Sequence, residues 1–586
     1  VIDAPSGEVS LVAMDRPADA SVDASNPFKQ IGTSFISDKA RVHIADGARI
    51  SVAGLENVQV SAARNAVEVE LRGDELKDTP VNREGALRGE TVYVDINRAL
   101  ANANAGKSTL IAKDSLESYQ AKLERTVAER STAGGLVNIQ SQGEAILESG
   151  AVVDLSGGSV QYTAANLKTT LLTSNGKLFD IASADAETRY DGIATRYVVD
   201  YGRWNRQEVI DLGQSYRYDP GYVDGKDAGA LQVVGMGGAV VQADVIGRTT
   251  TGQLQRDAGQ TPAGARLRIG SDAAPGDYKL NQRIEISSTA AILPASFDFG
   301  DALSSELKST LAFDPAKLGE GRIAQLELFG NQAAEVREAL RTPQGGAVRI
   351  TARSIDVGAD IVAQGGKIAL NARSNRANSS ETIPLNVLNV NVGEGVTLAA
   401  RGEWVNLLPG VGGAGATGAG IDGGMIALSA VNNVELGAGS HVDVTGGGRV
   451  RPNGRVAGGK GGAIVLEANA GVEATSTQTG AVGLSGELSG YGLAQGGSLS
   501  VSSGRIQIGG ENDAPPGTLN LDSDFPGRGG FAKVALTGRD GLTVADGVSL
   551  KPVPQAIVLE QNHVLQATGS RIENFSTRGV LDPRVR

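Results

Sequence analysis

The residues best suited to chemistry in this chain are aromatic and basic side chains gathered in one stretch. Six of the eleven tyrosines lie between residues 190 and 222, together with one of the two tryptophans. Five arginines are interleaved with them: Arg189, Arg196, Arg203, Arg206 and Arg217. Because Tyr, Trp and Arg dominate the energetics of binding surfaces, this composition favours contact with a partner molecule.

Two interpretations of the aromatic stretch stay open. It could be a partner-binding patch, or it could be a small accessory core that packs an insertion onto the rest of the protein. A binding patch would use Tyr190, Tyr197, Tyr201, Arg203, Trp204, Arg206, Tyr216 and Tyr218. In that case Trp204 and at least two of the tyrosines should expose their ring faces beside an arginine.

Catalytic and metal-binding chemistry finds little support. The three histidines, His43, His441 and His563, are far apart and lack metal-ligand spacing. Asp154 and Asp443 lie in single glycine-flanked corners, without the nine-residue repetition of calcium-binding repeats. There is no cysteine, which removes disulfides and thiolate sites. We therefore expect no catalytic residue, no cofactor, no metal and no enzymatic activity.

Charge and hydropathy argue against nucleic-acid binding and against a membrane-spanning segment. The chain carries 54 basic and 66 acidic residues, a net charge of −12, and no basic run that could form a nucleic-acid groove. No stretch approaches 18 consecutive apolar residues, so we expect no membrane-spanning segment. The sequence begins VIDAPSGEVS, without an initiator Met or a leader, and is expected to be a processed piece of a longer protein.

The elements that must position the aromatic stretch follow an internal repeat. Residues 423–447 read GGMIALSAVNNVELGAGSHVDVTGG, with three short runs in which apolar and polar side chains alternate. This pattern predicts three short strands, each with one buried face. Residues 134–158 align with this stretch without a gap, and related copies begin at Gly345, Gly461 and Lys533.

A single copy of the repeat would leave its apolar face in water and its backbone edges unpaired, so the copies must stack. The sequence therefore predicts an all-β protein, a parallel β-helix solenoid with short helical and loop insertions. Its 80 glycines are expected at corners that need a positive φ or a missing Cβ. The side chains expected to point inward are Ile426, Leu428, Val442, Val444, Val137, Ile139, Val153 and Leu155.

Three parts of one continuous solenoid are expected. Residues 1–158 form N-terminal coils, 159–344 form coils with aromatic-rich and helical insertions, and 345–586 form glycine-rich coils and a looser tail. Residues 1–40 should cap or lead into the body. The aromatic insertion, about residues 187–222, should stand off the rod as a lobe, because insertions in solenoids emerge from one face.

Three helices are expected among the insertions. The first, over about residues 114–130, should pack Leu116, Tyr119, Leu123 and Val127 onto the solenoid and leave Glu117, Lys122 and Glu129 in solvent. Two shorter helices are expected after residue 300. The first would contain Leu303, Leu307 and Leu311, and the second would contain Val336 and Leu340.

Several motifs resemble those of the large filamentous-haemagglutinin-like exoproteins, bacterial surface proteins exported by two-partner secretion. They are REGALRGETVYVDI (83–96), TVAERSTAGG (126–135), RYVVDYGRWNR (196–206) and the GAxVD[LV][ST]GG corners. The resemblance implies a right-handed β-helix that is extracellular or held at the bacterial cell surface, with a role in adhesion, biofilm or contact-dependent competition. It implies two kinds of partner: an outer-membrane two-partner secretion transporter, and a host or bacterial surface receptor, glycan or matrix polysaccharide.

This chain lacks the NPNL or NPNGI motif of the N-terminal secretion domain in such proteins, so we expect an internal segment. Our leading hypothesis is a non-enzymatic structural or adhesive rod that mediates attachment or presents a distal tip. One alternative is a β-helical polysaccharide lyase or hydrolase, which would need carboxylates and Arg or Lys converging on one face of adjacent coils. The other is a delivery stalk for a contact-dependent toxin.

Overall fold

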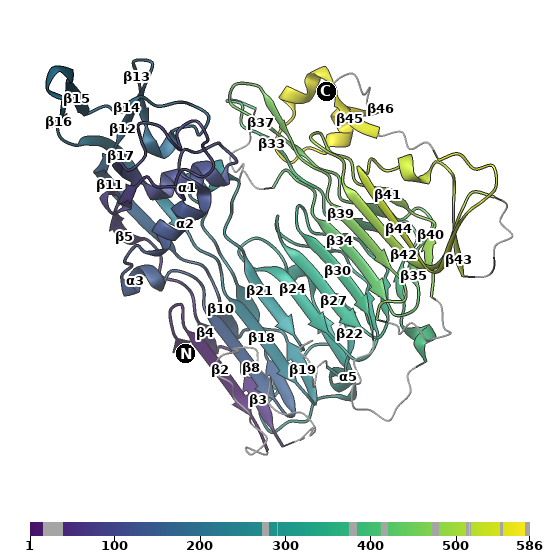
Figure 1. The fold of residues 1–586 in the computed structure, drawn as a ribbon. Helices are drawn as coiled ribbons and strands as arrows, with labels where there is room; N and C mark the ends of the chain where they lie inside the picture. Colours follow the sequence, from purple (N-terminus) through teal and green to yellow (C-terminus); the bar gives the residue numbers. More distant parts are fainter. Residues whose placement is uncertain are drawn as a thin grey trace.

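The structure is a computed structural model that describes residues 1–15, 39–271, 280–289, 291–373, 384–411, 420–471, 480–510, 515, 517–550 and 555–580. Strands make up 43 % and helices 11 % of it. Most of the strands belong to parallel sheets, which run side by side through the long body of the molecule (Figure 1). The protein is therefore all-β with parallel sheets, as the sequence predicts.

The longest sheet has twelve strands, and neighbouring strands, which come from successive passes of the chain, pair in parallel. Its strands are β2 (Glu8–Ala13), β8 (Leu136–Ser141), β18 (Ala230–Gly235), β21 (Ala265–Ile269), β24 (Ile323–Phe329), β27 (Ala347–Ala352), β30 (Lys367–Ala372), β34 (Met425–Ala430), β39 (Ala463–Glu467), β42 (Ser498–Ile508), β43 (Thr518–Leu521) and β44 (Lys533–Val544). In Figure 1 it crosses the molecule from the N-terminal end in purple to the C-terminal end in yellow-green.

Shorter parallel sheets collect the strands that follow each member of the long sheet. One pair of sheets contains β3 (Arg41–Ile44), β9 (Glu144–Leu147) and β19 (Gly238–Val241), then β22 (Arg283–Ile286), β23 (Thr310–Phe313), β25 (Ala334–Val336), β28 (Ile355–Val357), β31 (Val390–Val392), β35 (Val434–Leu436) and β40 (Val482–Leu484). The other pair contains β1 (Ile2–Asp3), β4 (Arg49–Ser51), β10 (Val152–Asp154) and β20 (Asp244–Ile246), then β26 (Leu340–Arg341), β29 (Ile361–Val362), β32 (Thr397–Ala399), β36 (His441–Asp443) and β41 (Glu487–Ser489).

The internal repeat corresponds to one pass of the chain through three sheets. Residues 423–447 supply β34, β35 and β36, and residues 134–158 supply β8, β9 and β10. The prediction of three short strands for each of these copies is therefore confirmed. The copy that begins at Lys533 differs, because it forms the single twelve-residue strand β44, which pairs with β42 across one shift in register.

A single hydrophobic cluster follows these passes from Val9 to Phe531. Its members form rows of like side chains, because the register places Ile368, Ile426 and Ile464 opposite one another. All eight side chains predicted to point inward are fully buried. Aliphatic burial and parallel backbone hydrogen bonds are thus repeated at each step of the stack.

The paired glycines of the repeat lie where successive passes come closest. A Cβ built on Gly366 would lie 1.9 Å from the carbonyl oxygen of Gly346, and one on Gly424 would lie 2.0 Å from that of Gly366. The same contact recurs at Gly462, 2.0 Å from the Gly424 oxygen. Each carbonyl accepts a hydrogen bond from the next pass, as the Gly366 oxygen does from the Met425 amide at 2.9 Å. These glycines are required by close approach of backbones, and no side chain fits.

A separate lobe is built from two segments, residues 58–130 and 159–225, and stands beside the N-terminal half of the parallel sheets (Figure 1). It has its own hydrophobic cluster, distinct from that of the sheets. Its strands are β5 (Val58–Ser61), β6 (Ala66–Glu70), β7 (Thr91–Asp95), β11 (Ser159–Thr169), β12 (Leu171–Ser174), β13 (Lys177–Asp180), β14 (Gly192–Ile193), β15 (Arg196–Tyr201), β16 (Arg206–Asp211) and β17 (Ser215–Gly225). Its helices are α1 (Ile96–Asn104), α2 (Lys113–Ala121) and α3 (Val127–Arg130).

The single helix predicted over residues 114–130 is two helices, α2 and α3, separated by a turn. The turn exists because Thr126 begins a new helix with a capping box, in which its side chain and that of Glu129 each bond the other's backbone amide. Glu129 is therefore buried, whereas Val127 is 69 % exposed, and both predictions for these side chains are wrong. Leu116 and its neighbours pack onto the cluster of the lobe, not onto that of the parallel sheets.

The predictions after residue 300 are partly wrong. A five-residue helix, α5 (Ser305–Ser309), contains Leu307, but Leu311 belongs to strand β23. The second predicted helix is absent, because Val336 ends β25 and Leu340 begins β26, both of them parallel strands with buried apolar side chains. Two apolar residues four apart fit a helix and also two short strands around a corner.

Both chain ends are more ordered than expected in their described parts. Residues 1–13 already supply β1 and β2 to the parallel sheets. Residues 555–580 form an antiparallel hairpin, β45 (Gln555–Leu559) with β46 (Ser576–Val580), and bury Phe575 against Trp404. The prediction of a loose tail is therefore wrong for residues 555–580, because buried apolar side chains hold them in place. Residues 551–554 and 581–586 lie outside the described residues.

Four further elements complete the α-helices and strands of the described residues. They are α4 (Gln253–Ala258) and the strands β33 (Trp404–Asn406), β37 (Gly448–Val450) and β38 (Val456–Gly458). Among the described residues, no helix is long and apolar enough to cross a membrane.

Replacement of a glycine at a stacking corner is expected to weaken the stack. Gly424→Ala would press a methyl group against the Gly366 carbonyl and should cost about 3 kcal/mol or more, as overpacking does in cores. Gly300→Ala is the matched control, because nothing lies within 4 Å of its Cβ position and its φ is not in the left-handed region. Thermal unfolding followed by circular dichroism should show a lower Tm for Gly424→Ala alone, and equal melting curves would contradict the close-approach explanation.

Candidate functional site

The predicted binding residues are concentrated on an exposed hairpin at the outer end of the lobe (Figure 1). Strands β15 and β16 are antiparallel: Arg196 lies opposite Asp211 at the base of the hairpin, and Tyr201 lies opposite Arg206 near its tip. A short 3₁₀ turn at Gly202–Trp204 joins the two strands. Trp204 is 71 % exposed and its ring lies 6.2 Å from that of Tyr201. The hairpin thus carries Tyr197, Tyr201, Arg203, Trp204 and Arg206 together in solvent.

The remaining predicted residues lie in two different environments. Tyr216 and Tyr218 are 66 % and 65 % exposed on β17, the strand that follows the hairpin. Tyr190 is instead buried in the core of the lobe, where its ring meets Phe179 edge to face at 5.7 Å and its hydroxyl donates to the Asp185 carbonyl. The assignment of Tyr190 to a binding patch is therefore wrong, because its ring packs inside the lobe.

Arg217 holds the lobe together from the inner side of the same strand. Its guanidinium contacts the carboxylates of Asp95, Asp180 and Asp219. Asp95 also accepts a hydrogen bond from the Arg98 amide and caps helix α1. Burial raises the pKa of Asp95, and the Arg98 amide and the Arg217 charge only partly oppose it. Arg217 thus neutralises carboxylates from three separate elements.

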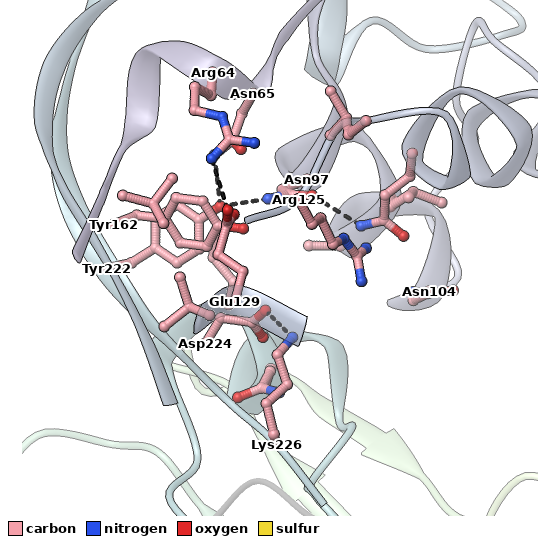
Figure 2. A pocket seen from close by; sticks show the side chains of 18 of the residues that line it. Arg64, Asn65, Asn97, Asn104, Arg125, Glu129, Tyr162, Tyr222, Asp224 and Lys226 are labelled. Atoms are coloured by element: carbon pink, nitrogen blue, oxygen red, sulfur yellow. Dashed lines mark hydrogen bonds and ion pairs between the residues drawn. The ribbon is translucent and has the colours of Figure 1, made fainter. Parts of the chain in front are cut away.

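A second site, which the sequence did not reveal, is a pocket at the base of the lobe (Figure 2). We call it the tyrosine pocket; its volume is about 310 Å³ and helices α1, α2 and α4 and strands β5, β11 and β17 border it. Its lining includes Arg64, Asn65, Asn97, Asn104, Gln120, Arg125, Glu129, Tyr162, Tyr222, Asp224, Lys226, Gln255 and Gln260. These residues come from distant segments, which explains why no sequence motif indicates the pocket.

Two stacked tyrosines form one side of the tyrosine pocket. Tyr162 and Tyr222 are paired across β11 and β17, and their ring centres lie 4.6 Å apart. Asn65 and Asn97 each donate a hydrogen bond to the Tyr222 hydroxyl, both at 2.9 Å. Gln120 donates to the side-chain oxygen of Asn97 at 2.8 Å and so fixes the orientation of that amide. Burial raises the pKa of both tyrosines, which keeps their hydroxyls protonated.

Two of the acidic side chains in the tyrosine pocket, Glu129 and Asp224, are paired with basic ones. Glu129 accepts hydrogen bonds from Arg64 at 2.8 Å and from the Thr126 amide at 2.7 Å. Burial opposes ionisation of Glu129, but these hydrogen bonds outweigh it and lower its pKa below the ordinary value. Lys226 contacts Asp224 at 2.5 Å. Figure 2 shows both pairs at the wall of the pocket.

A third site is a charged cleft of about 390 Å³. It lies between the parallel strands β32, β36 and β41 and the C-terminal hairpin of β45 and β46. Arg401 forms an ion pair with Asp443 at 2.9 Å and reaches Glu573 at 3.9 Å. His441 lies 3.4 Å from Glu487 on the neighbouring strand. The structure thus brings together acidic and basic side chains that the sequence did not show to converge.

Comparison with known proteins adds no relative, since no protein-family model, curated protein or solved structure matches this chain. Among the described residues, no group of three or more His, Asp or Glu side chains is placed to hold a metal ion. The functional conclusion therefore depends on the lobe, its pocket and the charged cleft.

Loss of Arg217 should unfold the lobe before the parallel sheets. Arg217→Met leaves three carboxylates without their shared counter-charge and should cost the lobe about 3–5 kcal/mol, as for a broken buried ion pair. The exposed Arg203→Met is the control. Limited proteolysis should cut the lobe of Arg217→Met first, and equal resistance in both variants would contradict this role.

The effect of Arg217→Met should also depend on pH. The pKa of Asp95 is raised in the folded state, so its ionisation costs stability as the pH rises through that pKa. Without Arg217 this cost grows, because the attraction that lowers the pKa is lost. The difference in Tm between variant and wild type should therefore shrink on acidification from about pH 7.5 to about pH 4.5.

Proposed function

We propose that this chain is a right-handed parallel β-helix and that it serves as the structural and adhesive part of a secreted or cell-surface bacterial exoprotein. Support comes from the passes of the chain, most of which give a strand to each of three sets of parallel sheets, as β27, β28 and β29 do. One aliphatic cluster follows these passes from end to end, as in a solenoid whose repeats contact only their neighbours. Such a body can hold a recognition element away from a surface.

The observation that carries the adhesive role is the concentration of exposed apolar side chains on the lobe. Of the 25 large hydrophobic side chains exposed among the described residues, eight lie between Tyr197 and Tyr218. They are Tyr197, Tyr201, Trp204, Val209, Ile210, Leu212, Tyr216 and Tyr218. Because contiguous apolar surface marks interaction sites, and Tyr, Trp and Arg dominate such sites, the hairpin and β17 are assigned to partner binding.

The partners follow from the sequence resemblance and from this surface. Export would require an outer-membrane two-partner secretion transporter. The lobe would then contact a host or bacterial surface receptor, a glycan or a matrix polysaccharide. This assignment places the protein outside the cell and gives it no catalytic role.

The test compares attachment of the purified chain to bacterial cells, cultured epithelial cells and matrix polysaccharide. The double variant Tyr201→Ser/Trp204→Ser removes the two rings at the tip of the hairpin, and we expect about tenfold weaker attachment with an unchanged Tm. The matched control is Leu178→Ser, which removes an apolar side chain exposed elsewhere on the lobe. Attachment that is unchanged in the double variant, or equally weakened in the control, would overturn the proposal.

The charged cleft favours a second candidate function, cleavage of an acidic polysaccharide. Carboxylates and arginines from neighbouring strands meet there, as a β-helical lyase or hydrolase would require. However, the carboxylate of Asp443 is already paired with Arg401, and that of Glu487 with His441, which disfavours a catalytic role for either.

We expect no cleavage of polygalacturonate, alginate or heparan sulfate, with or without calcium, in a reducing-end assay. Cleavage by the wild type that is lost in both Asp443→Asn and Glu487→Gln would instead establish the enzymatic function. The exposed Glu208→Gln, in the lobe, is the control for non-specific loss.

A further inference from the structure

The tyrosine pocket has a hydroxyl that is prepared to donate one hydrogen bond. A tyrosine hydroxyl has one proton and two acceptor lone pairs. Asn65 and Asn97 occupy the acceptor positions of Tyr222, so its proton points to neither of them. Gln120 keeps the Asn97 amide in that orientation. Burial raises the pKa of Tyr222, which maintains the proton at neutral pH.

The polar lining is also rich in side-chain amides, some of whose groups are already used: Gln255 bonds the backbone of Gly225 and Gly252, and Asn104 donates to Gln260. Six side-chain amides border the tyrosine pocket: Asn65, Asn97, Asn104, Gln120, Gln255 and Gln260. Each amide has a donating NH₂ group and an accepting oxygen. Sugar hydroxyls likewise donate and accept, so this lining matches a polyhydroxylated ligand better than an ion.

The charges of the pocket disfavour a charged ligand. The carboxylate of Glu129 is neutralised by Arg64, and that of Asp224 by Lys226. The other charged residues of the lining are the cationic Arg125 and the anionic Glu117 and Glu124, so the lining carries three basic and four acidic side chains. An acidic sugar or a phosphate would therefore gain no net electrostatic attraction from the lining.

The size of the pocket limits how much of a ligand it can hold. Its volume of about 310 Å³ lies at the lower end of the range of small-molecule sites, about 300–1,000 Å³. It can therefore enclose one or two sugar units, with the remaining chain outside. A peptide would instead be expected to use an exposed strand edge or an extended groove.

From these contacts we infer that the tyrosine pocket binds a neutral sugar unit of a surface or matrix glycan. Tyr222 donates to a ring or hydroxyl oxygen of the sugar, and the surrounding amides orient its other hydroxyls. The inference rests on the proposed adhesive function and gives it a ligand class. The exposed hairpin contacts the partner outside the pocket, and the pocket selects one of its sugar residues.

The experiment uses the full chain with D-glucose, D-galactose, D-mannose and N-acetyl-D-glucosamine, observed by saturation-transfer NMR and titration calorimetry. D-glucuronic acid and N-acetyl-glycyl-glycine amide represent acidic sugars and peptides. We expect at least one neutral sugar to bind, and Tyr222→Phe to weaken it about tenfold, the equivalent of about 1.4 kcal/mol. Tyr93→Phe is the matched control, because its hydroxyl bonds Glu68 elsewhere in the lobe.

A second variant guards against misfolding of Tyr222→Phe. Asn104→Ala changes a half-buried amide at the other end of the pocket, bonded to Gln260 at 3.3 Å, and should weaken the same sugar severalfold without lowering the Tm. Binding of none of the neutral sugars, stronger binding of glucuronate or the dipeptide, or equal binding by wild type and both variants would overturn the inference.

The outcomes also separate this inference from the proposed function. If no sugar binds while Tyr201→Ser/Trp204→Ser still weakens attachment, the adhesive function stands and the sugar assignment fails. If a neutral sugar binds through Tyr222 while the hairpin variant attaches normally, the pocket stands and the hairpin has no adhesive role.

Discussion

The structure depends on how closely the backbone of one pass approaches that of the next at the corners. There, a glycine carbonyl must accept a hydrogen bond from the strand of the next pass, and no Cβ fits between the two backbone segments. If a corner were held apart, the strand that starts there would lose its register, and the buried rows of Ile368, Ile426 and Ile464 would no longer face one another. The aliphatic core and the parallel hydrogen bonds therefore share one geometric requirement.

The lobe is held by a different kind of interaction. Its centre combines an aliphatic cluster with the contacts between Arg217 and three carboxylates, and its hydrogen bonds join side chains from distant parts of the chain. Irregular polar connections of this type can present specific side chains, whereas a uniform aliphatic stack cannot. This division explains why the exposed aromatics and the tyrosine pocket both lie in the lobe.

The regular part of the fold could be predicted from sequence because its signal is local and repeated. The alternation of apolar and polar residues around Leu428 indicates where a strand lies and which of its faces is buried. The paired glycines that follow indicate where the chain turns, and a second copy with the same pattern supports the assignment. The helical predictions failed where spacing alone was used: Val336 and Leu340 lie on separate strands, and Thr126 ends one helical segment by starting another. Tyr190 could not be told from the exposed Tyr197, since burial of a tyrosine depends on neighbours that sequence spacing does not supply. The Thr126-x-x-Glu129 spacing was the one available signal of the buried Glu129.

The pairing of the lobe also fixes an order of assembly. Strand β11 pairs with β5 on one side and with β17 on the other, and Arg217 on β17 completes the charge of Asp95 at the start of α1. No fragment that ends before residue 215 contains all of these partners. By contrast, the pass at residues 134–158 finds the neighbours on one of its sides within residues 1–51. As the chain emerges from its N-terminus, the first passes of the parallel stack can therefore pair while the lobe is still incomplete, and the surface assigned to recognition is finished only after these passes are available.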